Sequence, residues 1–314
     1  MSYLPGDTSG GGIFNPANVL GGPTGLGLPA GSQSVLTLGT QGSLTLGFPV
    51  VITDGPGADF SVFENAFFNA PALNMAFAEV AFVEVSTNGL DFVRFPSCYV
   101  GPPGPTGPFA LFSPGRHRGL AGCLPVLAHV PSGFGDPFDP VVSGGDAFDL
   151  ADLDGMPLVQ SGIVDLSAIH FVRLVDVEAG VDVDANGQLI EDSGGPGSAD
   201  IDAVSVIHAA GSSFAGHPQT QMAYDAAGFL WVSFEDGDGL GDLDAASFRC
   251  SFNVQLLPAQ NFLAFFQAIS VTSDRIAFRS LVPVQGQGVF GVLAVSIGDL
   301  STARRSAVQF KIQG

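Results

Sequence analysis

The segment AEVAFVEVSTNGLDFVRF (residues 78–95) carries the clearest structural pattern in the chain. Two short runs alternate apolar and polar side chains, which is the period of a β-strand with one buried face. The tetrapeptide STNG at residues 86–89 separates the two runs. Asn-Gly readily supplies the positive φ angles that a tight turn between antiparallel strands requires. We therefore predict a β-hairpin over this segment.

Strand patterns of the same kind extend outward from this hairpin in both directions. SVLTLG (34–39) and GSLTLGF (42–48) flank a short turn and predict a second hairpin. Alternation returns in DLSAIHFVRLVDV (165–177) and in ADIDAVSVIHAA (199–210). Helical periodicity is nearly absent. The sequence therefore predicts an all-β protein built from many short strands.

The patterns also divide the chain into two parts. Strand signals run through residues 1–208, interrupted at 97–146 by a stretch that is rich in Pro and Gly and weakly patterned. A stretch of that length without periodicity is either a functional excursion or a mobile loop. Further strand patterns fill residues 209–314 without repeating the first part, and we predict a separate, smaller C-terminal β domain there.

The charge of the chain excludes several classes of partner. Its 314 residues include 30 Asp and Glu against 10 Lys and Arg, which gives a formal net charge of −20. Nucleic acids and anionic membrane surfaces both require clustered Lys and Arg, so both are excluded. No apolar run of 18 residues is present, so no membrane insertion is expected. Divalent cations are natural partners of such a surface, and solubility is the alternative reason for the excess of acid.

The expected location is extracellular or at the cell surface. MSYLPGDTSGGG (1–12) lacks the basic and apolar regions of a signal peptide, which taken literally indicates a cytoplasmic protein. The composition is typical of secreted proteins, and we expect a leader that has been removed. The cysteines leave two alternatives open: Cys98 and Cys123 form a loop-closing disulfide, or both are free thiols together with Cys250.

Several blocks occur along the chain in one order: FNPANVLGG, GSLTLGF, TDGPGADFSVFENAF, VEVSTNGLDF, DLSAIHFVRLVDV and SADIDAVSVIH. In this order they resemble bacterial secreted or cell-surface proteins with a discoidin-like (galactose-binding-like) jelly-roll domain, often bearing C-terminal sorting anchors. The resemblance covers about residues 3–208. It implies a jelly-roll β-sandwich for the first part, a surface location, and an early strand that lies beside the last strand, near 201–207.

The segment TDGPGADFSVFENAF (53–67) places a carboxylate on an apolar strand pattern. Glu64 falls in phase with Phe60 and Val62, where an unpaired charge would be very costly. In the pairing that the resemblance implies, the acidic entrance of the last strand lies beside this segment, and Ca²⁺ neutralises such clusters with oxygen ligands. The alternative is that Glu64 caps backbone amides or faces solvent. The predicted calcium ligands are Asp54, Asp59, Glu64, Asn65, Asp200 and Asp202.

Two further loops concentrate carboxylates. DVDANGQLIED (182–192) sets Asp182, Asp184 and Asn186 at alternate positions before a Gly, which is the opening spacing of an EF-hand loop without its helices. EDGDGLGDLD (235–244) crowds carboxylates around glycines, and the candidate ligands are Glu235, Asp236, Asp238, Asp242 and Asp244. We predict Ca²⁺ at both loops, and a solvated acidic turn is the alternative for each.

These patterns together predict a non-catalytic, calcium-stabilised extracellular protein that acts in surface adhesion or matrix assembly, with copies of itself or glycans as partners. The alternative function is that of a carbohydrate-binding module, for which Tyr99 and Trp231 are the candidate ligand-binding aromatics. A third is a glycan-active hydrolase with Glu64 and Asp202 as its carboxylate pair. No GxSxG nucleophile elbow supports a serine hydrolase.

Overall fold

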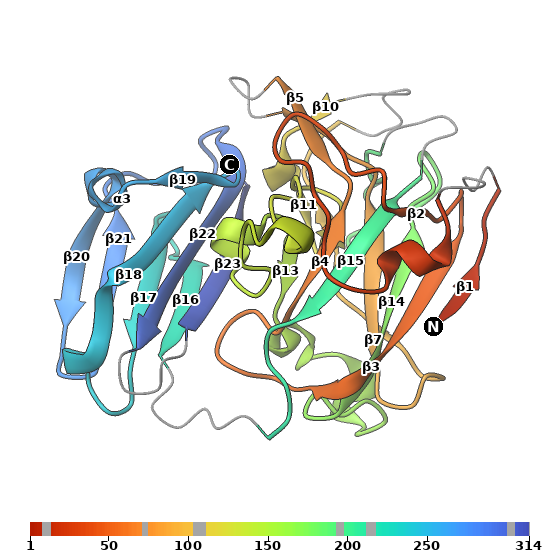
Figure 1. Cartoon of the computed structure of the whole chain (residues 1–314). Coiled ribbons are helices and arrows are strands. Elements are labelled where there is room, and N and C mark those ends of the chain that lie inside the picture. Colours follow the sequence, from red (N-terminus) through yellow and green to blue (C-terminus); the bar gives the residue numbers. More distant parts are fainter. Residues whose placement is uncertain are drawn as a thin grey trace.

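Antiparallel β-sheets make up most of the regular structure, which confirms the all-β prediction. The computed structural model describes residues 1–7, 14–70, 75–102, 111–192, 198–211, 218–299 and 305–313. In Figure 1, strands β16–β23 gather at one end of the molecule and strands β1–β15 at the other. The helices are short: α1 (Pro140–Ser143), α2 (Pro157–Gln160), α3 (Ala259–Phe265), η1 (Pro16–Val19), η3 (Pro114–Arg116), η4 (Val130–Ser132), η5 (Leu150–Leu153) and η6 (Leu240–Asp242).

Two sheets form a sandwich in the first part of the chain. The first has the order β1-β3-β14-β7-β12, with β8 also paired to β7, and the second has the order β13-β4-β15-β2. The strands of the first are β1 (Ser2–Leu4), β3 (Ser43–Ile52), β14 (Ile169–Asp176), β7 (Ala81–Ser86), β12 (Leu120–Ala121) and β8 (Val93–Arg94). Those of the second are β13 (Asp146–Phe148), β4 (Phe60–Glu64), β15 (Asp200–Val206) and β2 (Leu36–Thr37). The expected pairing of the early strand β4 with β15 is observed.

The structure confirms one predicted hairpin and corrects the other. Strands β7 and β8 pair with Val85 opposite Val93, as predicted for residues 78–95. Only Gly89 of the Asn-Gly pair has a positive φ, at 75°, while the Asn88 side chain accepts hydrogen bonds from the amides that follow it. The hairpin predicted over 34–48 is wrong, because β2 and β3 belong to opposite sheets. Gln41, with a φ of 62°, lies in the turn that carries the chain from one layer to the other.

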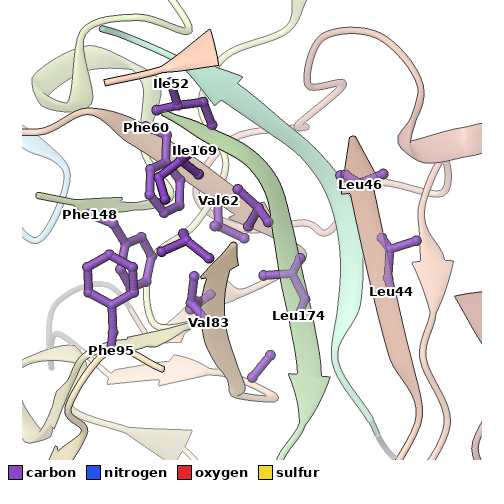
Figure 2. Close-up of a cluster of buried hydrophobic side chains, with 14 of the residues drawn as sticks. Leu44, Leu46, Ile52, Phe60, Val62, Val83, Phe95, Phe148, Ile169 and Leu174 are labelled. Carbon is purple, nitrogen blue, oxygen red and sulfur yellow. The ribbon is translucent and has the colours of Figure 1, made fainter. Parts of the chain in front are cut away.

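The main hydrophobic core fills the space between these two sheets (Figure 2). Leu44 and Leu174 reach it from the first sheet, and Phe60 and Phe148 from the second. The Phe60 and Phe148 rings stack with their centroids 5.4 Å apart, and Phe95 meets both rings edge-on at 5.9 and 5.0 Å. Offset stacks and edge-to-face contacts are the favoured aromatic geometries. The Phe-rich composition therefore serves the core of the sandwich.

The Pro/Gly-rich stretch at 97–146 covers one face of the sandwich; its residues 103–110 lie outside the described residues. Within it, Val126 packs against Phe63 and Ala203 on the outer face of the second sheet. As a result every residue of β4 is buried, and the simple in-out alternation is lost there. The small strands around this stretch are β5 (Phe67–Ala70), β6 (Met75–Phe77), β9 (Cys98–Tyr99), β10 (Leu111–Phe112) and β11 (His117–Arg118). All three cysteines are free thiols, so the disulfide alternative is not realised.

Two four-stranded sheets build the second part, in the orders β16-β17-β21-β20 and β19-β18-β22-β23. They enclose their own core, to which Val232 and Phe234 contribute from one sheet and Val295 from the other. The predicted boundary at residues 208 and 209 falls between β15 and β16. The strands are β16 (Gln219–Tyr224), β17 (Leu230–Glu235), β18 (Leu243–Phe252), β19 (Gln255–Leu257), β20 (Phe266–Val271), β21 (Arg275–Ser280), β22 (Phe290–Asp299) and β23 (Arg305–Gln313).

The last strand, β23, connects the second part to the first. The carbonyl of Ala307 accepts a hydrogen bond from Ala58 N (3.1 Å). Two residues further on, the Gln309 side chain accepts from Ala147 N (3.0 Å) and donates to Gly145 O (3.1 Å). Because these contacts use backbone groups of the loops around β4 and β13, they fix the register of β23 against the sandwich.

A buried ion pair completes this contact. Lys311 is the only lysine of the chain, and its Nζ lies 2.7 Å from Asp146 Oδ1 and 3.2 Å from Leu120 O. The other oxygen, Asp146 Oδ2, accepts from Gly122 N (2.9 Å) and Cys123 N (2.8 Å). The Asp146 side chain is 2% exposed and the Lys311 side chain 9%. Together they join three segments that are far apart in the sequence.

We predict that Lys311→Met lowers the free energy of unfolding by about 3–5 kcal/mol, because it leaves the buried Asp146 carboxylate without its counterion. Chemical denaturation measures this loss. The control is Arg275→Met, whose exposed guanidinium is 4.0 Å from Glu235 and which should cost about 0–1 kcal/mol. Similar small losses in both variants would show that the buried pair does not hold the two parts together.

Candidate metal sites

The ligands predicted within TDGPGADFSVFENAF are divided between the two ends of β4. Asp59 immediately precedes the strand and Glu64 ends it. Five residues of extended chain, roughly 16 Å, therefore separate the two carboxylates along the strand. Asp54 lies near Asp59, whereas Asn65 follows Glu64. The structure thus places these residues in two groups and not around one ion.

Asp59 is fully buried at the start of β4. Its Oδ1 accepts a hydrogen bond from Gly55 N (2.8 Å) and shares another with His208 Nδ1 (2.8 Å), and its Oδ2 accepts from Leu150 N (2.7 Å). A Cβ atom on residue 55 would lie 2.4 Å from the His208 ring, so a glycine is needed there. Burial raises the pKa of Asp59 to about 8. One carboxylate therefore joins three loops.

Asp149 is the third member of this group and is absent from the predicted ligand set. One carboxylate oxygen from each of Asp54, Asp59 and Asp149 lies within 4.8 Å of the others. Burial, followed by the charge of Asp59, raises the pKa of Asp149 to about 8. Its position follows from the pairing of β13 with β4, in which Phe148 lies opposite Phe60. No local sequence pattern encodes that register, so no signal in the sequence identified Asp149.

Glu64, at the other end of β4, has 2% of its surface exposed. Its Oε1 accepts a hydrogen bond from Asp200 N (3.0 Å), while its Oε2 accepts none from any residue that the structure describes. Burial, followed by the charge of Glu79, raises the pKa of Glu64 well above its ordinary value. Asp200 accepts from the Thr37 hydroxyl, and its carbonyl accepts from Asn65 N (3.0 Å). Glu64 therefore fits the alternative in which its carboxyl group caps a backbone amide, and the raised pKa favours the neutral form.

Asp202 is held by different groups. Its carboxylate accepts hydrogen bonds from Thr24 N (2.9 Å) and from the Thr24 hydroxyl (3.1 Å), and it is 1% exposed. Burial raises the pKa of Asp202 to about 6. A glycosidase needs both carboxylates on a cleft that admits substrate. The burial of both Glu64 and Asp202 gives the hydrolase alternative no support.

In the acidic loop at 182–192, the Asp carboxylates accept hydrogen bonds from backbone amides of the loop and of neighbouring segments. Asp184 Oδ1 accepts from Asn186 N (2.8 Å) and Gln188 N (2.9 Å), and its Oδ2 accepts from Tyr99 N (2.8 Å). Burial acts to raise the pKa of Asp184, but these backbone donors outweigh it and lower the pKa. Asp182 likewise accepts from a backbone amide within its own turn (2.7 Å). These oxygens are therefore occupied by N–H donors.

The prediction of Tyr99 as a glycan-contacting aromatic is wrong, because this side chain lies in the interior. It is 3% exposed and belongs to a buried cluster with Phe82 and Leu120. Its hydroxyl donates to the Glu191 carboxylate. Burial, followed by this hydrogen bond, raises the pKa of Tyr99 above its ordinary value. The ring offers no surface to a ligand, whereas Trp231 is partly exposed.

Three of the five carboxylates in the loop at 235–244 gather in one place. One oxygen from each of Asp236, Asp238 and Asp242 lies within 4.8 Å of the others. The remaining two point elsewhere: Glu235 is 55% exposed and faces Arg275, and Asp244 Oδ1 caps its own turn. This group is compact because all its members come from seven consecutive residues around glycines, and the sequence alone therefore identifies it.

Asp236 differs from the capped carboxylates described above. It is fully buried directly after β17, and from the described ranges its Oδ1 accepts only a long hydrogen bond, from Asp238 N (3.4 Å). Its Oδ2 is buried and accepts no hydrogen bond from the described part of the chain. Burial, followed by the neighbouring Asp238 carboxyl, raises the pKa of Asp236. Such an oxygen requires a proton or a cation, and hard oxygen ligands of this kind suit Ca²⁺ or Mg²⁺.

Comparisons with other proteins add no further identification. No protein-family model, curated protein or solved structure matches the chain. None of the helices in the described ranges combines the length and the apolar character that a membrane span requires. Two carboxylate groups, Asp54–Asp59–Asp149 and Asp236–Asp238–Asp242, are therefore the candidate metal sites that the geometry supports.

The first of these groups predicts a pH dependence. Asp59 and Asp149 have folded-state pKa values of about 8 against an ordinary value of 3.8, so the folded protein holds protons that the unfolded chain has released. The stability linked to them is full below about pH 4 and is lost as the pH rises through 8. We expect the free energy of unfolding in metal-free buffer to fall across this range, and Asp149→Asn to flatten the fall.

Urea unfolding at a series of pH values measures this slope. The control is Asp165→Asn, because hydrogen bonds from Ser167 lower the pKa of Asp165 and so remove it from the range above pH 4. A slope that is the same in Asp149→Asn as in the parent protein would contradict the prediction.

Proposed function

We propose that this protein is a non-catalytic, calcium-stabilised component of a cell surface or extracellular matrix. One observation carries the calcium part of the proposal: Asp236 Oδ2 is a buried acceptor that receives no hydrogen bond from the residues that the structure describes, and it belongs to a group of three carboxylates. A divalent cation bound among Asp236, Asp238 and Asp242 would satisfy that oxygen and remove the repulsion between them.

The chemistry of the group favours Ca²⁺. All three side chains offer carboxylate oxygens, and no Cys or His belongs to the group, which disfavours zinc. Ca²⁺ accepts six to eight oxygens in flexible geometry, whereas Mg²⁺ demands a near-ideal octahedron. The exposed Asp238 gives an ion access to the buried Asp236. Extracellular calcium modules bind with dissociation constants of about 10⁻⁴–10⁻³ M, which a site with few preformed ligands can reach.

The position of the group supports a structural role for the ion. Asp236 follows β17, and Asp242 precedes β18, which belongs to the other sheet of the second part. The same loop is attached to the turn before β21, because Asp236 N donates to Asp274 O (2.7 Å) and Leu240 N donates to Ser273 O (3.0 Å). An ion at this loop would therefore hold the connection between the two sheets.

Two other observations support the proposed location of the protein at a cell surface: a resemblance in sequence and the net charge. The ordered blocks in residues 3–208 resemble bacterial surface proteins with a discoidin-like domain, and the observed pairing of β4 with β15 agrees with what that resemblance implies. The net charge of −20 suits a protein that works in contact with free divalent cations. Adhesion or matrix assembly is the role that we propose for such a protein.

Calcium should stabilise the parent protein and not Asp236→Asn. At a free Ca²⁺ concentration ten times the dissociation constant, the expected gain in unfolding free energy is about 1.4 kcal/mol. Thermal unfolding in EDTA and over a Ca²⁺ titration measures the effect, and a parallel Mg²⁺ titration tests selectivity.

The matched control is Asp244→Asn, which removes one negative charge from the same loop but lies outside the group of three. It should retain the Ca²⁺-dependent shift in melting temperature. If the parent protein shows no shift, or if Asp236→Asn shifts as much as the parent does, the proposed site is wrong.

Matrix assembly predicts larger species that depend on calcium. Dynamic light scattering of the purified protein should show a larger hydrodynamic radius in millimolar Ca²⁺ and a return to the smaller radius when EDTA is added. A monomer-sized radius under both conditions would contradict assembly through calcium and leave adhesion as the surface role.

A further inference from the structure

A hollow of about 230 Å³ lies on the outer face of the sheet β16-β17-β21-β20. It lies on the second part of the chain and is lined by none of the carboxylates of the two candidate metal sites. The outer face is the one opposite the core, because Val232, Phe234 and Phe278 point the other way. Gln221, Ala223, Asp225, Trp231, Ser233 and Arg275 line the hollow from this face, and Met222 and Tyr224, the core-facing residues of β16, complete its lining.

The strand register explains why this face is hollowed. Ser233 lies opposite Gln221 on one side and Ala277 on the other, so two small side chains occupy the middle of the face. The next row on one side contains Trp231, and the next row on the other side contains Arg275, opposite Glu235. These two rows are four residues apart along the strands, roughly 13 Å. Large side chains therefore border a trough with a floor of small ones.

The indole of Trp231 is held in place from its edge. Its Nε1 donates to Asp225 Oδ2 (3.0 Å), and the same oxygen pairs with Arg279 Nη2 (2.8 Å). The Arg279 guanidinium lies over the Phe229 ring, 3.5 Å from its centroid. The hydrogen bond from Trp231 is the first of several that lower the pKa of Asp225 to about 2, so Asp225 stays charged. Trp231 thus has a fixed orientation before any ligand arrives.

The trough combines an aromatic surface with planar polar side chains. Binding sites for small molecules place apolar and aromatic surface beside a few polar groups that fix orientation. A pyranose ring has the matching character, since one face presents C–H groups that can stack on an indole and its edge presents hydroxyls. We propose that this trough binds a neutral pyranose unit of an oligosaccharide, with Trp231 as the stacking surface and Gln221 and Arg275 as hydrogen-bonding side chains.

Charge and size select this class of ligand. The cations of the face are balanced, because Arg275 faces Glu235 (4.0 Å) and Arg279 pairs with Asp225. No excess positive charge remains to recruit an anionic sugar to a protein of net charge −20. The hollow is smaller than the pockets that enclose drug-sized molecules, so it fits one ring of a chain that continues along the open face.

The protein contains a single tryptophan, so Trp231 itself reports the test. The probes are cellohexaose, xylohexaose, mannohexaose and chitohexaose, with a galacturonate hexamer as the acidic comparison. At least one neutral hexasaccharide should change the tryptophan fluorescence with saturation and should protect the indole from quenching by acrylamide. If no neutral probe binds, or if only the acidic one binds, the proposal is overturned.

Three variants test the assigned roles. Gln221→Ala and Arg275→Ala keep the reporter and should each weaken binding of that hexasaccharide several-fold. Trp231→Ala, measured by calorimetry, should weaken it at least about tenfold. The control is Phe265→Ala, an aromatic on α3 that is 65% exposed and should bind as the parent protein does. Melting temperatures verify folding, and unchanged binding in Trp231→Ala would overturn the proposal whether or not calcium stabilises the protein.

Discussion

The fold depends on supplying hydrogen-bond donors to carboxylates that are buried. Twelve acidic side chains are buried among the residues that the structure describes, and an ionised carboxylate without donors would be too costly in the interior. Asp59, Asp146 and Asp184 each accept from at least two backbone N–H groups, and Asp176 accepts from the amides of two distant loops. This chain is rich in Gly and Pro and its strands are short. The carboxylates therefore accept hydrogen bonds from backbone N–H groups that regular secondary structure does not pair.

Two buried carboxylates depart from this pattern, because one oxygen of each lacks a hydrogen-bond donor among the described residues. Glu64 and Asp236 each keep one buried oxygen without a donor in the described structure. Glu64 lies deep beside another carboxylate, and burial favours its neutral, protonated form. Asp236 lies beside Asp238, which is exposed, so an ion can reach it from solvent. The same lack of a donor can therefore be met in two ways: by a proton at Glu64 and, in the role proposed above, by a cation at Asp236.

The two parts of the chain differ in what covers their sheets. The stretch at 111–146 packs over β4, which is why all five residues of that strand are buried. On the second part, β16 alternates exposed and less exposed side chains, and the outer face of its sheet remains open to solvent. A covered sheet face is closed to ligands, whereas an open face with a fixed aromatic ring can bind one.

The sequence by itself determined the all-β class and the hairpin at 78–95, because a period of two and a turn are local properties. It also located the group around Asp236, since its three carboxylates lie within seven residues. Only the tertiary structure decided that Asp149 joins Asp59, that Tyr99 points inward, and that residues 34–48 divide between two sheets. The physical reason is that alternation reports which side of a strand is buried but not which strand lies beside it. The donor that satisfies Asp59 comes from Leu150, and that contact exists only after the sheets have paired.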